Sequence, residues 1–309
     1  MSQNPSAPVT RAALRIEAPT LAIAIVVYGG WLAATRLHGD LAWPLRAAIG
    51  GWLIAWHGSL QHEIIHGHPT PWRRLNTLIG SAPLSLWLPF ERYRRTHLAH
   101  HATDRVTEPA HDPESRYLAA AAGDSRGLDH RIGALQASLA GRMLLGPIFE
   151  VWRFLQAEAR ALRGGGQAGA WMRHLLGVAL VIAWLKLACG MSLVDYLLTF
   201  VYPGAALTLI RSFAEHRAHV LPGHRVAVVE RAPVMGLLFL HNNLHAVHHS
   251  HPAAPWYSLP GLYRQGRDQV LTANGGLVYA GYGEVFSRFL FKPHDDLVHP
   301  STVQGEGRP

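Results

Sequence analysis

Three clusters of histidine, each next to an apolar run, constrain this chain more than any other feature of its sequence. The first cluster is His62-Glu63-Ile64-Ile65-His66, with its two histidines at i and i+4. The other two share the motif H-x-x-H-H, formed by His97, His100 and His101 and by His245, His248 and His249. Residues at i, i+3 and i+4 of a helix project from one face, so each cluster can direct its imidazoles at a common metal. Eight such ligands exceed what one zinc uses and are about what two irons need.

The apolar runs beside these clusters predict a membrane protein. Hydrophobic residues make up 49% of the chain and charged residues 16%, against about 25% charged in a typical soluble domain. Runs long enough to cross a membrane are expected at residues 20–37, 41–61, 171–188 and 192–210. Short turns at 38–40 and 189–191 make each pair antiparallel, which brings every histidine cluster to one membrane face.

The remaining segments complete an all-α prediction, with about four transmembrane helices and a cytoplasmic helical cap that bears the three clusters. Residues 75–90 are apolar but contain Pro83 and Pro89, so we expect a re-entrant or interfacial hairpin. The segment from Gly141 to Arg163 has the spacing of an interfacial amphipathic helix. The predicted division is a disordered cytoplasmic tail over 1–19, a membrane domain over 20–260 and an interfacial and tail segment over 261–309, the last including the aromatic stretch from Val285.

The net charge and the cysteine content limit the partners and cofactors that we expect for this chain. The net charge of +8 comes without a nucleic-acid recognition module, so no nucleic-acid partner is expected. Arginine beside an anionic leaflet explains the charge, and the arginine-rich loops place the clusters on the cytoplasmic face, in the inner membrane. Cys189 is the single cysteine, which excludes a thiolate-ligated iron–sulfur cluster on this chain. A redox reaction would need electrons from a separate donor.

Three other interpretations of the histidines stay open at this point. The first cluster matches H-E-x-x-H, in which two histidines bind zinc and Glu63 would be the general base of a membrane metalloprotease. Such a protease needs three protein ligands and would leave two clusters unexplained. The clusters could also be polar helix surfaces, or belong to a non-catalytic metal-binding membrane protein or transporter. Transporters place ionisable ligands inside their spans, whereas these clusters follow the spans.

The three clusters together resemble those of the membrane fatty acid desaturase family, which includes related hydroxylases and carotenoid ketolases. The resemblance covers residues 52–260 and includes the sequence Asn243-Leu244-His245-Ala246-Val247-His248-His249-Ser250-His251-Pro252. The interval from His66 to His97 favours the desaturase arrangement, because sterol hydroxylases have a much shorter one. The resemblance implies two irons, held by His62, His66, His97, His100, His101, His245, His248 and His249. It also implies a ligand after the fourth span, and there Glu215-His216-Arg217 makes His216 the expected ninth ligand, with His241 as the alternative.

The resemblance further implies an oxygen-dependent enzyme that introduces a double bond into an acyl chain of a membrane lipid or thioester. The expected electron donor is a separate ferredoxin- or rubredoxin-like protein. Hydroxylation or ketolation of a lipid or carotenoid on the same centre is the alternative. His68, His219 and His251 are expected to lie outside the ligand set. Five polar residues are candidates to orient the ligands: Asp104, Asp112, Glu114, Asn242 and Asn243.

Overall fold

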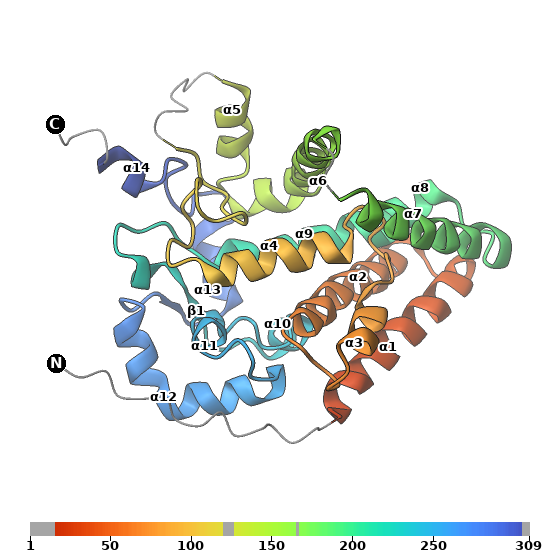
Figure 1. The fold of residues 1–309 in the computed structure, drawn as a ribbon, viewed down its shortest axis with the longest axis horizontal. Coiled ribbons are helices and arrows are strands. Elements are labelled where there is room, and N and C mark those ends of the chain that lie inside the picture. The colour runs from red at the N-terminus through yellow and green to blue at the C-terminus, as the bar shows by residue number, and fades with distance from the viewer. Residues whose placement is uncertain (1–15, 120–126, 165–166, 305–309) are drawn as a thin grey trace.

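Long helices gathered at one end of the molecule form two antiparallel pairs (Figure 1). The structure is a computed structural model that describes residues 16–119, 127–164 and 167–304. The first pair is α1 (Ala18–Arg36) and α2 (Trp43–Ile65), joined by a short 3-10 turn at His38–Asp40. In the second pair, α7 (Ala168–Ala183) continues through a π-turn at Trp184–Ala188. Its partner comprises α8 (Leu193–Tyr196), a π-turn at Leu197–Val201 and α9 (Tyr202–Glu215).

Three helical segments within the described residues are long and apolar enough to cross a membrane. They are Ala18–Arg36, Ala168–Ala188 and Leu193–Glu215. They correspond to three of the four predicted spans. The fourth, α2, has 23 residues but is not among them, so a topology of four crossings stays a prediction.

The position of α2 explains why it is less apolar than the candidate spans, since it packs between α1 and α9. Most of its second half is buried, including the polar side chains of Gln61, His62 and Glu63. Glycines let the backbones approach closely: a Cβ at Gly50 would lie 2.4 Å from a carbonyl oxygen, and one at Gly204 would lie 2.5 Å from Ile54. A helix enclosed by other helices does not need the high hydropathy that lipid contact selects.

The segment predicted as a hairpin contains α3 (Arg73–Gly80) and a series of turns, before α4 (Phe90–Ala102) begins. Gln61 on α2 donates a hydrogen bond to the carbonyl of Gly80 at 2.7 Å, which fixes the end of α3. Leu84 in the turns that follow and Phe90 at the start of α4 are both buried. The segment therefore returns to the side from which it came and does not cross the bundle.

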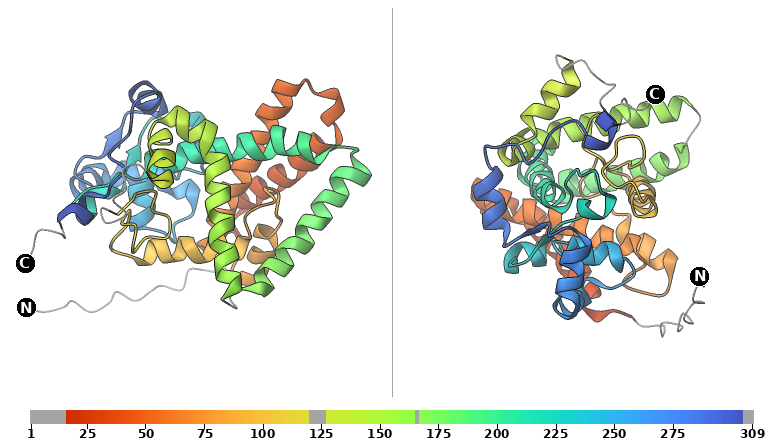
Figure 2. Two further views of the ribbon diagram at one scale, coloured as in Figure 1. Left: turned by 90° about the horizontal axis from the view of Figure 1, so that it is seen from above. Right: turned by 90° about the vertical axis from the view of Figure 1, so that its left-hand side faces the viewer.

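The amphipathic helix expected at Gly141 to Arg163 is α6 (Leu139–Arg163). Ser138 caps it by accepting a hydrogen bond from the amide of Gly141. In Figure 2 this helix runs across the direction of α2 and α9. Large apolar side chains along one of its sides stay exposed: Leu144, Ile148, Trp152, Leu155 and Leu162. This is the arrangement of a helix lying in a membrane interface.

The remaining elements form the cap at the other end of the molecule (Figure 1). They are α5 (Leu128–Leu135), α10 (Pro233–Leu238), α11 (His245–Ser250), α12 (Leu259–Ala273), α13 (Tyr282–Phe289), α14 (Pro300–Gln304) and 3-10 turns at Pro222–Arg225 and Trp256–Ser258. The strands β1 (Val228–Val229) and β2 (Val278–Tyr279) pair in parallel, a small departure from an all-α fold.

The end of the chain is more deeply packed than an interfacial segment would be. Val285 is fully buried, and Trp256 and Phe289 are also part of the main core, whereas Phe291 is 82% exposed. The pairing of β2 with β1 links residues beyond 260 to the segment that leads into α11. The predicted tail over 1–19 falls mostly outside the described residues.

Candidate metal centre

Four elements deliver the nine predicted histidines to one place. His62 and His66 lie at the C-terminal end of α2, and the second cluster lies in the last two turns of α4. His216 follows the last residue of α9, and the third cluster begins α11. The nitrogens then separate into two groups, and within each group the nearest ligand atoms all lie within 4.8 Å of one another.

The first group has five histidines and draws on all three clusters: His62, His66, His97, His101 and His248. The Nε2 atoms of His66 and His97 are 3.0 Å apart, and those of His101 and His248 are 3.1 Å apart. The second group has four: His100, His216, His245 and His249. Here Nε2 of His245 lies 2.9 Å from His216 and 3.1 Å from His249. The two groups are adjacent, since the rings of His101 and His249 stack with centroids 4.4 Å apart.

The hydrogen bonds around the groups determine which ring nitrogen carries a proton. His100 Nδ1 is 2.9 Å from the Asp112 carboxylate, and His97 Nδ1 is 3.2 Å from Glu114. His245 Nδ1 faces the side-chain oxygen of Asn242, whose amide donates to Glu215 at 2.8 Å. Because these partners are acceptors, each Nδ1 must be the donor, and each Nε2 is left with a lone pair.

Lone pairs that face one another require a cation between them. His216 Nδ1 donates to the carbonyl of Arg225, so its Nε2 is also bare where it meets the bare Nε2 of His245. The buried Nε2 of His62 has no hydrogen-bond partner within the described residues. Two bare nitrogens at hydrogen-bond distance repel, whereas a metal ion would satisfy both. The donor set therefore fits two metal ions that accept nitrogen ligands, such as iron.

The electrostatics keep the third cluster neutral and Glu114 charged. At His100, by contrast, burial lowers the pKa, but the hydrogen bond to Asp112 and the charges of nearby carboxylates together outweigh it and raise the pKa. Burial, followed by neighbouring histidine charges, lowers the pKa of His245, His248 and His249 well below the usual range. Burial alone would raise the pKa of Glu114, but its interactions with His97, including the hydrogen bond from Nδ1, lower that pKa to about 2. Neutral imidazole is the form that binds metal.

Of the five candidates to orient ligands, Asp112, Glu114 and Asn242 bond to ligand histidines. Asn243 instead donates to the carbonyl of Val229 at 2.6 Å, and Asp104 is exposed. Sequence reasoning did not identify two further contacts, the Arg225 carbonyl to His216 and the Asn242–Glu215 bond. Neither leaves a local signal in the sequence, because each depends on how the loops pack.

The neighbouring histidines lie outside both groups. His68 pairs with Glu17 through Nδ1, and His219 accepts a bond from the amide of Leu221. His241 packs beside the ring of Trp256, and His251 is exposed. The geometry thus favours His216 over His241 for the ninth position.

The comparisons with known proteins fit this geometry. A family model described as fatty acid desaturase matches residues 41–280. The chain belongs to the fatty acid desaturase family. A search of curated individual proteins gave no match. Family membership explains why all three histidine clusters are present and argues against a metalloprotease. In keeping with this, Glu63 does not belong to either histidine group and accepts a hydrogen bond from the amide of Trp256 at 3.0 Å.

An apolar pocket of about 260 Å³ adjoins the centre of this family member. It lies between α2, α4, α6 and α9, and its apolar wall includes Ile54, Leu88, Val151, Val201 and Leu209. Glu114, the hydrogen-bond partner of His97, forms part of the same lining. The pocket thus offers an apolar surface suited to a hydrocarbon chain. It reaches Glu114, which holds His97 of the first histidine group.

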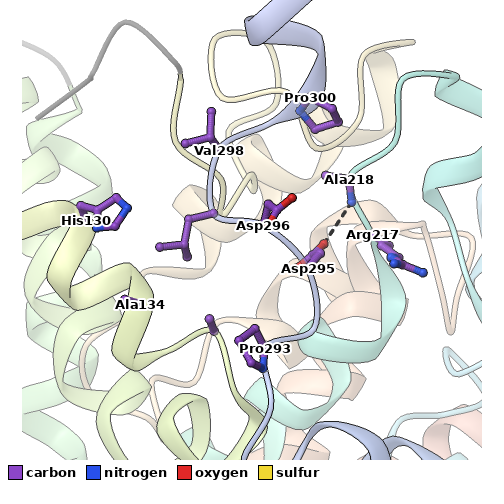
Figure 3. Close-up of a pocket in the computed structure, with 11 residues that line it drawn as sticks. His130, Ala134, Arg217, Ala218, Pro293, Asp295, Asp296, Val298 and Pro300 are labelled. Carbon is purple, nitrogen blue, oxygen red and sulfur yellow. Dashed lines mark hydrogen bonds between the residues drawn. The ribbon is translucent and has the colours of Figure 1, made fainter. Parts of the chain in front are cut away.

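A larger cavity of about 970 Å³ lies elsewhere, between α5 and the segment before α14 (Figure 3). Its walls include His130, Arg217, Asp295 and Pro300, and Asp295 accepts a hydrogen bond from the amide of Ala218. None of the nine clustered histidines lines it. The cavity is therefore separate from the candidate centre.

Proposed function

We propose that this protein is an oxygen-dependent di-iron desaturase that introduces a double bond into the acyl chain of a membrane lipid or thioester. The observation that carries the proposal is the division of nine histidines into adjacent groups of five and four with bare nitrogens facing inward. The proposed ligands of the first iron are His62, His66, His97, His101 and His248, and those of the second are His100, His216, His245 and His249.

When bound, the two irons would supply the activation of dioxygen. The chain itself holds the ligands in place: Asp112, Glu114 and Asn242 fix the ring orientations through Nδ1. The apolar pocket would hold the hydrocarbon and keep water from it. Electrons would come from a separate ferredoxin- or rubredoxin-like protein, and the centre would face the cytoplasm from the inner membrane.

Desaturation and hydroxylation differ in whether oxygen enters the product. The test is expression in a host that lacks the protein, under labelled dioxygen, with mass analysis of the lipids. We expect a lipid that is two mass units lighter and carries no label. A labelled hydroxyl or keto product would contradict the desaturase proposal and indicate the alternative, a hydroxylase or ketolase on the same centre.

The pocket gives a second test of the same proposal. Ala205 lines it, so Ala205→Leu should fill part of its volume and lower product formation at least tenfold, with iron content unchanged. Ala33→Leu is the matched control, because Ala33 is exposed on α1. Equal activity of the two variants would place the substrate elsewhere.

A further inference from the structure

Four arginines line a groove between α3 and α4, outside the metal centre. Arg73 and Arg74 come from α3, and Arg94 and Arg95 come from α4, one turn before the second histidine cluster. The groove has a volume of about 850 Å³, and Thr77, Phe90 and Leu98 complete much of its lining. It is the part of the described surface where we find positive charge most closely gathered around a hollow.

The protein offsets these four positive charges only in part. The one acidic residue in the lining is Glu91, whose carboxylate is already engaged by Arg173 on α7 at 2.7 Å. Within the described residues, none of the four arginines forms an ion pair with a carboxylate. Partial burial and the charge of Arg73 lower the pKa of Arg94, and the opposite charge of Glu91 offsets them only in part. Like charges brought together in this way favour the binding of an anion.

Two contacts place the groove at the level of the membrane surface. The loop before α3 meets the start of α1, where the amide of Glu17 donates to the carbonyl of Pro69 at 2.9 Å. The beginning of α4 meets the first turns of α7 through the pair of Glu91 with Arg173. Both α1 and α7 begin candidate membrane spans. The groove thus lies where these spans enter the bilayer.

The apolar side chains around the groove indicate a lipid. Leu98 lines the groove and is 40% exposed, and Trp72 and Leu78, which lie on the α3 segment outside the lining, are 56% and 73% exposed. Tryptophan, leucine and arginine side by side on a short helix are typical of a segment lying among lipid headgroups. The arginines alone would attract an acidic protein partner, which would not need exposed apolar side chains beside them.

We propose that the groove formed by Arg73, Arg74, Arg94 and Arg95 binds the phosphate of an anionic phospholipid at the membrane surface. Arginine pairs with phosphate through two parallel hydrogen bonds, and the guanidinium groups of two helices can approach one phosphate from both sides. Leu98 in the lining would contact the upper part of the acyl chains, and Trp72 and Leu78 on the α3 segment would lie among the neighbouring lipids. This site is independent of the proposed catalytic function.

The test is a titration of the full-length protein in neutral detergent with phosphatidylglycerol and phosphatidylcholine, read by native mass spectrometry. We expect phosphatidylglycerol to bind more tightly. The double variant Arg73→Gln/Arg94→Gln should lose roughly 30-fold in affinity, since each arginine near an anionic surface contributes about fivefold. Arg231→Gln/Arg264→Gln removes two exposed charges from the α10–α12 region and should bind as the wild type does.

Three results would overturn the proposal. One is equal affinity for the two lipids, and another is an equal loss of affinity in both double variants. The third is competition by inorganic phosphate at concentrations matching those of the lipid, which would show a site for a free anion and no lipid. A thermal melt of each variant checks that it is folded. The pair Arg73→Lys/Arg94→Lys keeps the charge but loses the paired hydrogen bonds, so its affinity should lie between those of the wild type and the glutamine pair.

Discussion

At the residue scale, the orientation of the histidine rings depends on the hydrogen-bond acceptors at Nδ1 as much as on the spacing of the histidines in the sequence. Asp112 receives Nδ1–H of His100 and also accepts backbone bonds from Thr107 and Glu114. It therefore sets the tautomer of His100 and anchors the loop after α4. Groups of this kind typically change metal affinity or activity by about 10–100-fold when they are removed.

The first prediction concerns Asp112. Asp112→Asn can present a donor where an acceptor is needed, so the second histidine group should lose iron affinity by about 10–100-fold. Asp104→Asn is the matched control, since Asp104 is exposed in the same loop. Iron content after dialysis against a graded chelator measures the effect. Identical chelator curves for the two variants would show that Asp112 does not support the site.

The second prediction separates two histidines three residues apart. His216 Nε2 lies 2.9 Å from His245 Nε2, whereas His219 accepts a bond from its own loop. His216→Ala should lower iron occupancy and abolish product, and His219→Ala should keep both. A selective loss of iron in the His219 variant would mean that the ninth ligand has been assigned wrongly.

The third prediction concerns Glu63, which would be essential in a metalloprotease. Its carboxylate accepts the amide of Trp256, so it joins α2 to the segment after α11. Glu63→Gln keeps an acceptor oxygen and should leave substantial product formation, while His66→Ala should abolish it. Complete loss of product in the glutamine variant at normal iron content would contradict this assignment.

At the scale of elements, a buried arginine holds together two loops that carry the site. Arg225 is 1% exposed and donates to Glu108 at 3.0 Å and to the carbonyl of Val106 at 2.9 Å. Its own carbonyl accepts from His216. The loop after α9 is thereby fixed against the loop after α4, which contains Asp112 and Glu114.

The fourth prediction is that Arg225→Ala destabilises the protein by about 1–3 kcal/mol, because the carbonyl of Val106 loses its donor and Glu108 keeps only its pair with the half-exposed Arg105. Arg267→Ala breaks a more exposed pair, with Glu230, in which the arginine side chain is 48% exposed, and should lower the melting temperature much less. Thermal melts in detergent compare the two. Similar melting temperatures would show that the Arg225–Glu108 pair does not stabilise the cap.

The sequence predicted local spacing well and tertiary contacts poorly. The grouping of the three clusters could be predicted from the i, i+3 and i+4 spacing, and the structure brings their eight histidines together with His216. Their role as ligands stays a prediction. The arginine groove and the Arg225 contacts could not be predicted, because they join residues far apart in the chain. The burial of Val285 differed from the expected interface, since aromatic and aliphatic residues serve a packed cap as well as a membrane surface.

At the scale of the whole molecule, the centre lies at the ends of the spans, away from their connecting turns. The turn at His38–Asp40 joins the far ends of α1 and α2, while His62 and His66 lie at the opposite end of α2. Since the first group draws on all three clusters, the clusters lie together at this end of the bundle, as the predicted topology with one shared membrane face requires. The predicted topology therefore depends directly on the metal centre.

The fifth prediction is that Gly39 and Asp268 lie on opposite sides of the membrane. Asp268 on α12 has a side chain that is 97% exposed, and a Cβ at Gly39 would meet no atom within 4 Å. With Cys189→Ser as background, Gly39→Cys should react with an impermeant maleimide in intact cells, and Asp268→Cys should react after lysis. Labelling of both cysteine variants in intact cells would contradict the proposed orientation.

The measurement that tests the central claim most directly is the metal content of the full-length protein, purified without chelators from iron-supplied cells. Two groups of nitrogen ligands predict close to two irons per chain and little zinc. One zinc per chain, with no iron even after reconstitution, would contradict the proposed di-iron centre.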